Sequence, residues 1–322
     1  MGRRRKTSTT HGVLIVDKPA GVTSHDVVQR MRRALNERRV GHAGTLDPMA
    51  TGVLVVMVGE GTKLAPFLSA DDKTYAATVS LGRATDTLDA EGEETASAPL
   101  PAWWHDAAAA EVRLGEALEA ERARRLQAPP VYSAIKVGGR SAHARVRAGE
   151  EVDLAEREVV VRALELTRRD VERGELELRL DVGKGYYVRA LARDLGERLG
   201  VPAHLVALRR LTSGAFGLAD ALPGDASPRD HLLTLEEAAT RALAVARLTE
   251  AGVARARCGG PMKGEDFVEP PPAQGLSAWL APDGHLVAIG ELREGRPAVR
   301  RGIVGPPEAP PRPEVARLDP ES

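Results

Sequence analysis

Short apolar runs rich in β-branched residues constrain the fold of this chain more than any other feature. Such runs predict buried strands, and they lie at 12–17, 53–58, 74–81, 158–167 and 176–182. Apolar residues at helical spacing predict helices at 24–35, with Ser24 as N-cap, and at 103–127, 188–199 and 232–245. Because strands and helices do not alternate regularly, the pattern favours an α+β domain with mixed or antiparallel sheets.

The pattern changes near residue 248. Short strands and Gly/Pro turns follow up to about residue 304, for example the run 286–290. We therefore expect a main domain over 11–245 and a small β-rich domain over 246–304. The basic segment 1–10 and the Pro/Glu-rich segment 305–322 are predicted to be disordered tails.

Composition excludes several classes of protein. With 45 basic and 46 acidic residues, net charge −1, any nucleic-acid surface must be a local patch. The single cysteine, Cys258, excludes an internal disulfide and a Cys-rich zinc site, and it fits a reducing, cytoplasmic setting. No apolar run reaches the roughly 18 residues that span a bilayer. The sequence also has no P-loop, no GxGxxG after a strand, no HExxH and no nucleophile elbow, so redox chemistry, ATP hydrolysis and zinc catalysis lack a recognisable site.

Two segments could carry chemistry. The loop 42–52 holds Asp47 between glycines and a proline, just before an apolar strand. A carboxylate held rigidly there could act as nucleophile or base, although Asp-Pro is also a common turn starter. The segment 184–189 places Arg189 at a helix entry, where it could pair with a carboxylate and keep it ionised, or simply face solvent.

A third segment, 122–149, is a basic patch that contains no acid. Its basic side chains are Arg122, Arg124, Arg125, Lys136, Arg140, Arg145 and Arg147, accompanied by His143. Such a patch favours a phosphate backbone, and the alternative is a solvated face in an Arg-rich chain. The pair Arg209-Arg210 could also present charge to phosphate.

Taken together, the segments resemble the bacterial tRNA pseudouridine synthase B family, which modifies the uridine at position 55 in the T-loop of tRNA. The resemblance covers about Gly12 to Leu211. The carrying motifs are GVLIVDKPAGVTSHDVV (12–28), GHAGTLDPMATGVL (41–54), KTYAATVSLGRATDTLDAEG (73–92), QAPPVYSAIKVGGR (127–140), GKGYYVRALARDLG (183–196) and AHLVALRRL (203–211).

The resemblance implies a role for individual residues. Asp47 matches the catalytic aspartate, and Arg189 matches the arginine that pairs with it. Tyr75 matches the tyrosine that stacks on the target base. The residues matching the lining of the uridine or RNA pocket are His42, Tyr187 and Leu208.

The resemblance also implies an architecture and a mode of action. We expect a mixed, largely antiparallel central sheet with an RNA-gripping insertion at about 95–150, followed by a C-terminal PUA-like RNA-binding domain. The expected partner is the T-arm of tRNA, without a membrane and without an obligatory protein partner, for a cytoplasmic monomer. The resemblance also implies that no cofactor and no metal are needed.

The sequence departs from the family pattern at three places. The stretch 119–126 reads EAERARRL where the family usually carries Phe-x-Gly, and after Lys136 the usual Tyr and Leu-Ala-Arg are replaced by Ser-Ala-His143-Ala-Arg-Val. These two departures concern RNA gripping rather than chemistry. Tyr186 stands where threonine is common, and it is assigned no role.

Three other readings compete with a stand-alone synthase. An RNA-binding or RNA-chaperone protein would use the basic patch and leave Asp47 as a turn residue. The catalytic subunit of a guide-RNA-dependent synthase shares the aspartate motif but acts with partner proteins. A glycosidase would need a second acid opposite Asp47, for which Asp86 and Asp89 are the candidates.

Overall fold

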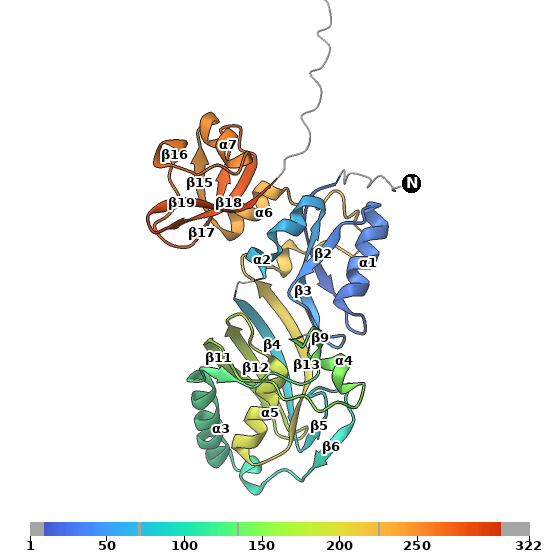
Figure 1. The fold of residues 1–322 in the computed structure, drawn as a ribbon. Helices are drawn as coiled ribbons and strands as arrows, with labels where there is room; N and C mark the ends of the chain where they lie inside the picture. The colour runs from blue at the N-terminus through green and yellow to red at the C-terminus, as the bar shows by residue number, and fades with distance from the viewer. Residues whose placement is uncertain (1–9, 70–71, 134, 225, 304–322) are drawn as a thin grey trace, which may run out of the picture. The chain divides into compact units, whose positions relative to one another are not determined.

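The computed structural model describes residues 10–69, 72–133, 135–224 and 226–303, which form two compact units (Figure 1). The large unit spans Gly12–Leu233, and the described part of the small unit consists of residues 10–11 and the segment from Thr234 onward. Apart from Thr10, both predicted tails lie outside the described residues.

The large unit is built on an eight-stranded sheet. Its path is β1-β3-β13-β4-β12-β11, with β2 paired to β3 and β14 paired to β13. The strands are β1 (Gly12–Lys18), β2 (Val40–Ala43), β3 (Thr51–Val58), β4 (Lys73–Leu81), β11 (Val161–Asp170), β12 (Glu175–Val182), β13 (Ala203–Ser213) and β14 (Phe216–Gly217). Among these pairings β3 and β13 run parallel and the others antiparallel, which confirms the α+β class.

Smaller ladders and helices complete the large unit. The ladders pair β5 (Arg83–Thr85) with β6 (Glu94–Ser97), β7 (Leu126–Gln127) with β10 (Arg157–Glu158), and β8 (Lys136–Val137) with β9 (Arg140–Ser141). The helices are α1 (Ser24–Leu35), η1 (Gly59–Leu64), α2 (Ala65–Leu68), η2 (Ala102–His105), α3 (Ala107–Arg122), α4 (Ala142–Val146), α5 (Val188–Leu199) and η3 (Leu218–Asp220). Among the described residues, no helix is long and apolar enough to cross a bilayer.

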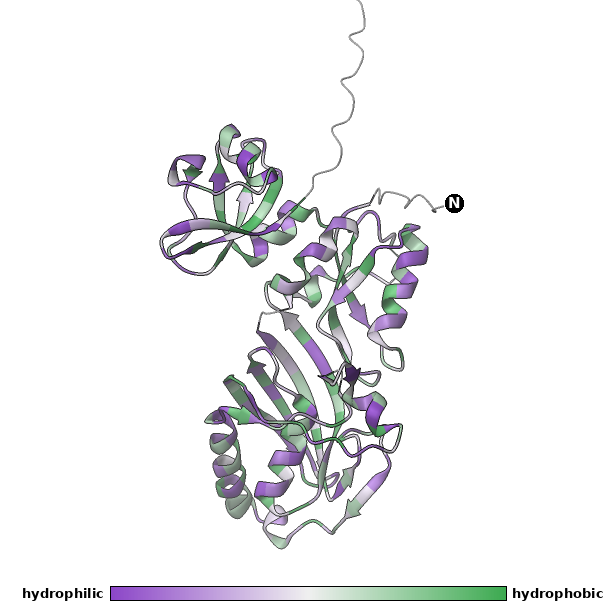
Figure 2. Ribbon diagram, viewed as in Figure 1, coloured by the Kyte–Doolittle hydropathy of each residue, from purple (hydrophilic) through white to green (hydrophobic). Residues whose placement is uncertain are grey.

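Alternating burial along the strands places the core against the helices. In β12 the residues Leu176, Leu178, Leu180 and Val182 are buried, and their neighbours are more exposed. This alternation of hydrophobic and hydrophilic residues can be followed in Figure 2. Helix α5 packs on β13 and β4, and α3 packs on β11 and on α5. The core therefore holds α5 against the central strands of the sheet.

Helix ends differ from the sequence prediction where a side chain caps more effectively. Thr23, not Ser24, caps α1 in a reciprocal pair with Asp26. Asp106 caps α3, and α3 ends at Arg122 rather than at the prolines, because residues 126–127 pair with β10 instead. The helix predicted at 188–199 and the pair of strands predicted within 158–182 are both present in the structure.

The small unit is a five-stranded sheet in the order β16-β15-β17-β18-β19 with short helices. Its elements are α6 (Leu235–Ala242), β15 (Ala244–Leu248), α7 (Glu250–Arg257), η4 (Gly264–Asp266), β16 (Phe267–Glu269), β17 (Leu276–Leu280), β18 (Leu286–Arg293) and β19 (Arg296–Gly302). Trp279 and Phe267 meet edge to face in its core, with ring centroids 4.9 Å apart. The boundary that the sequence predicted after residue 245 falls inside β15.

Candidate active site

Asp47 lies in the loop between β2 and β3, and this loop is anchored immediately before it. The hydroxyl of Ser24 donates to the carbonyl of Leu46 at 3.0 Å and accepts from the Leu46 amide at 2.9 Å. Ser24 is almost fully buried at the start of α1. The residue that the sequence analysis took as a helix cap therefore fixes the backbone next to Asp47.

The same loop is anchored again immediately after Asp47. The carbonyl of Pro48 accepts hydrogen bonds from the Gly21 amide at 2.9 Å and from the Lys18 ammonium at 3.2 Å. Lys18 is fully buried, and its ammonium also donates to the carbonyls of Pro19 and Val22. Burial lowers the pKa of Lys18. Because hydrogen bonds hold the backbone on both sides of Asp47, the backbone position of this residue is fixed. Its side chain stays one-third exposed.

Arg189 holds the Asp47 carboxylate in a two-pronged ion pair. Its Nε donates to Oδ2 at 2.9 Å and its Nη2 donates to Oδ1 at 3.2 Å. The remaining donors reach the carbonyl of Thr87 through Nη1 at 2.8 Å and that of Tyr132 through Nη2 at 2.8 Å. A planar guanidinium fixed at four points aims the carboxylate, so the predicted pairing of Asp47 with Arg189 is present in the structure.

A second carboxylate shares the same guanidinium. Asp89 Oδ2 lies 3.6 Å from Arg189 Nε, and its side chain is 5% exposed. Its Oδ1 accepts from the Thr87 hydroxyl at 2.7 Å and from the Glu91 amide at 3.1 Å. An arginine in the first turn of a helix opposes the helix dipole, and the two aspartates compensate for that charge.

The electrostatic environment of Asp47 contains opposing contributions. Burial raises the pKa of Asp47 above its ordinary value, and the neighbouring Asp89 acts in the same direction. The positive charges of Arg189 and Lys18 favour the ionised form but do not outweigh burial. That Arg189 keeps Asp47 ionised therefore stays a prediction: the charge of Arg189 acts in that direction, and burial opposes it.

Tyr75 and Leu208 belong to adjacent strands beside this loop. Tyr75 lies on β4, Leu208 lies on β13, and both are 8% exposed in one hydrophobic cluster. Burial raises the pKa of Tyr75, so its phenol is neutral near neutral pH. The charge of Asp47 also acts on this phenol.

His42 and Tyr187 approach from two further elements. His42 lies on β2, and its Nδ1 is buried without a hydrogen bond to any residue that the structure describes. Burial, aided by Arg210, lowers the pKa of His42, which keeps the ring neutral. Tyr187 is the N-cap residue of α5, and its amide and carbonyl are both bound by the side chain of Gln127, at 2.9 and 3.2 Å. Burial raises the pKa of the Tyr187 phenol, and the charges of Arg189 and Asp47 are among the smaller influences on this pKa.

Several of these positioning residues were not assigned by the sequence analysis. Ser24, Lys18 and Gln127 act through backbone contacts, which no spacing rule reveals. Asp89 was considered as an acid opposite Asp47 in a glycosidase. It instead lies against the same guanidinium as Asp47, and Asp86 accepts from the Glu93 amide.

The basic patch is less positive than its sequence indicated. Arg122 and Arg124 pair with Glu119 and Glu121, and Arg140 and Arg145 both pair with Glu150. These acidic residues lie just outside the segment 122–149. The exposed basic residues that form none of these ion pairs are Arg125, Lys136 and Arg147.

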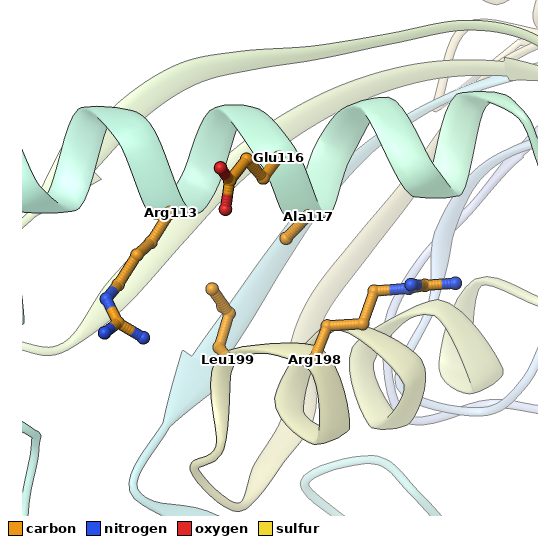
Figure 3. Close-up of a pocket in the computed structure, with 5 residues that line it drawn as sticks. All are labelled: Arg113, Glu116, Ala117, Arg198 and Leu199. Atoms are coloured by element: carbon orange, nitrogen blue, oxygen red, sulfur yellow. The ribbon is translucent and has the colours of Figure 1, made fainter.

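Two hollows lie away from Asp47. One, of about 330 Å³, is lined by Arg113, Glu116 and Ala117 of α3 and by Arg198 and Leu199 of α5 (Figure 3). Leu199 ends α5, so at 1.5 Å per residue it lies about 15 Å along the helix from Arg189. The other, of about 550 Å³, is lined by Arg124, Arg193 and neighbouring polar residues. Neither hollow is lined by Asp47, Arg189 or Asp89.

Comparisons with known proteins agree with one another. The model of the TruB family pseudouridylate synthase N-terminal domain matches residues 32–188, and that of the tRNA pseudouridylate synthase B C-terminal domain matches residues 189–238. A tRNA pseudouridine synthase B of Corynebacterium aurimucosum is 46% identical over 283 residues, which cover 86% of this chain and 91% of the relative. A Mycobacterium protein of the same name is 43% identical over 297 residues, covering 91% and 95%.

Solved structures share the fold at lower identity. The crystal structure of a Cbf5-Nop10-Gar1 complex gives a TM-score of 0.68 at 23% identity, covering 91% of this chain and 84% of the other. The structure of an H/ACA RNP bound to a substrate RNA containing 2′-deoxyuridine gives 0.67 at 21% identity, covering 91% and 85%. These similarities extend over both units.

Proposed function

The chain belongs to the TruB family of pseudouridylate synthases, and from this membership we propose that it isomerises the T-loop uridine of tRNA, position 55, to pseudouridine without a guide RNA. The observation that carries the proposal is the Asp47 carboxylate. It is one-third exposed, while the guanidinium that aims it is almost fully buried.

The reaction needs one carboxylate and a shaped pocket. The N1–C1′ bond breaks, the uracil turns, and a C5–C1′ bond forms, so no electrons and no net protons enter or leave. Asp47 either attacks C1′ or removes a proton from C2′ to give a glycal. Both routes require an ionised carboxylate of fixed direction, and the two-pronged contact with Arg189 supplies that direction.

The target base must leave a folded RNA loop before it can react, at a cost of a few kcal/mol. We assign Tyr75 to stacking on the extruded uracil, which offsets part of that cost. We assign Leu208 and Tyr187 to the walls of the same pocket, and the neutral ring of His42 to contact with the RNA.

RNA gripping is assigned to the insertion at about 95–150 and to the small unit, which we take as PUA-like. Exposed basic residues of the patch, such as Arg125, Lys136 and Arg147, would face phosphates. We propose that the protein acts as a monomer, without an obligatory protein partner, in the cytoplasm where its tRNA substrate is found.

Tritium release tests this function directly. An unmodified tRNA transcript labelled with [5-³H]uridine loses one tritium for each pseudouridine formed, because C5 becomes bonded to C1′. We expect the purified chain, with no guide RNA added, to release close to one tritium per tRNA. A transcript with cytidine in place of the target uridine should release almost none.

The competing readings give different results in the same assay. An RNA chaperone would bind the transcript and release nothing. A guide-dependent synthase would release tritium only after guide RNA and partner proteins were added. Equal release from both transcripts would contradict the proposed position.

A further inference from the structure

Arg210 is a fully buried arginine beside the site, where burial and the charge of Arg210 both lower the pKa of His42. It is 1% exposed on β13. Its Nε donates to the carbonyl of Val53 at 2.6 Å, and its Nη2 donates to that of Gly44 at 2.9 Å. Arg210 stands directly opposite Tyr75 on the adjacent antiparallel strand, and both side chains are buried, so the two side chains are cross-strand neighbours on one face of the sheet. The positive charge of Arg210 favours the ionised form of the Tyr75 phenol. One side chain thus joins β3 to the start of the Asp47 loop and lies beside Tyr75.

The backbone around Arg210 is arranged for close approach. Tyr75 on β4 is its direct partner in the strand register, and Gly52 on β3 is its partner on the other side. A Cβ atom at position 52 would lie 2.1 Å from the Arg210 carbonyl oxygen. The segment around Arg210 is therefore tightly held between two strands.

Arg210 differs from a typical surface arginine in the groups that its guanidinium contacts. Its neighbour Arg209 pairs at the surface with Asp17 at 2.6 Å. The hydrogen-bond partners of Arg210 are instead two carbonyls, neither of which carries a formal charge. A buried cation held by neutral groups is costly, and it strongly favours any negative charge that develops next to it.

We propose that Arg210 is a positioning residue that fixes the Tyr75 hydroxyl and stabilises negative charge on its oxygen while Tyr75 passes the C5 proton during pseudouridine formation. This inference rests on the proposed function. It also corrects the sequence-based idea that Arg210 presents its charge to phosphate, because its side chain is buried.

The proton transfer is balanced. After the C5–C1′ bond forms, the phenol of Tyr75 donates its proton to N1. The C5–H bond then breaks and its proton goes to the Tyr75 oxygen, so Tyr75 ends neutral as it began. The oxygen carries negative charge between these transfers, and there the neighbouring guanidinium of Arg210 acts.

A spectroscopic test needs no turnover. With ¹³C at the Cζ atom of tyrosine, the chain gives four signals, one for each of its four tyrosines. The Tyr75 signal is assigned by its loss in Tyr75→Phe. We expect Arg210→Gln to move that signal more than the other three, and Arg209→Gln to leave it in place. An unmoved Tyr75 signal in Arg210→Gln overturns the proposal, whatever the activity.

A double-mutant cycle then tests the catalytic part in single-turnover tritium release. We expect Arg210→Gln to lower the rate about tenfold or more with little change in tRNA affinity. In a Tyr75→Phe background the same substitution should cost about twofold or less, since the hydroxyl is already absent. Equal losses in the two backgrounds would show a purely structural role and overturn the proposal.

Charge-retaining Arg210→Lys covers a failure of Arg210→Gln to fold, and it should recover part of the rate. If wild type releases no tritium, the proposed function fails, and the Tyr75 signal still decides whether Arg210 binds the phenol.

Discussion

Replacing Arg189 with lysine isolates the part of the site that aims Asp47. The substitution keeps the positive charge and removes the planar fork. In the structure the guanidinium makes two hydrogen bonds to the Asp47 carboxylate and one each to the carbonyls of Thr87 and Tyr132. An ammonium group has three donors that diverge from one point, so it cannot reproduce the paired contact.

The magnitude follows from the contact that is lost. A hydrogen bond to a charged group contributes about 1.5–3 kcal/mol, and lysine loses at least one of the two bonds to Asp47. If about 2–3 kcal/mol of that orientation is needed in the transition state, the rate falls about 30- to 150-fold. Affinity for tRNA should change by about threefold or less, because Arg189 is buried behind the carboxylate.

The assay is single-turnover tritium release at saturating enzyme, with tRNA binding measured separately. Arg193→Lys is the matched control, because Arg193 lies one turn further along α5 and binds Asp194 and the Ala128 carbonyl instead. A rate for Arg189→Lys within about threefold of wild type would refute the reasoning. So would a loss confined to tRNA binding.

Three further predictions concern the surroundings of the site. Asp89→Asn should shift the acid limb of the pH–rate profile to lower pH, because Asp89 helps to raise the pKa of Asp47 and activity is lost as pH falls through that pKa; an unmoved limb would contradict this. Gly52→Ala should reduce the free energy of unfolding in urea by about 3 kcal/mol or more, since φ is +103° and Cβ would overlap the Arg210 backbone, whereas Gly200→Ala, strained but open, should cost about 1 kcal/mol. Tyr186→Phe should lower the same free energy by about 1–2 kcal/mol, because its hydroxyl donates at 2.9 Å to the fully buried Glu121; an unchanged urea midpoint would contradict that role.

Local patterns were enough to predict five of the eight strands of the large sheet, because burial leaves a readable trace in β-branched runs. They did not predict β2, β14 or the central strand β13, in which arginines interrupt the apolar run. The hairpin 161–182 and the helix 188–199 follow from apolar spacing and a glycine stop. Helix lengths were overestimated where the deciding contact was distant. The end of α3 depends on residues 126–127 pairing with β10, some thirty residues further on.

Motifs were enough to identify the ion pair at the centre of the site, while the residues that hold this pair in place could not be identified from the sequence. Asp47 and Arg189 were found because their motifs resemble a family, and the structure joins them. The sharing of Arg189 by Asp89 arises from a fold that brings the 85–91 turn beside β13. Two of the departures from the family pattern, at 119–126 and at Tyr186, meet in one buried hydrogen bond between Glu121 and Tyr186.

The most direct test of the account compares wild type with Asp47→Asn in tritium release, alongside tRNA binding and thermal unfolding. A carboxylate whose pKa is raised by burial lowers stability as pH rises through that pKa. The neutral amide avoids that cost but leaves the buried Arg189 with Asp89 as its remaining carboxylate neighbour, so thermal unfolding serves to check that the variant is folded. The account predicts normal tRNA binding and no detectable tritium release. An Asp47→Asn protein that folds, binds tRNA and releases tritium at a near-normal rate would contradict it.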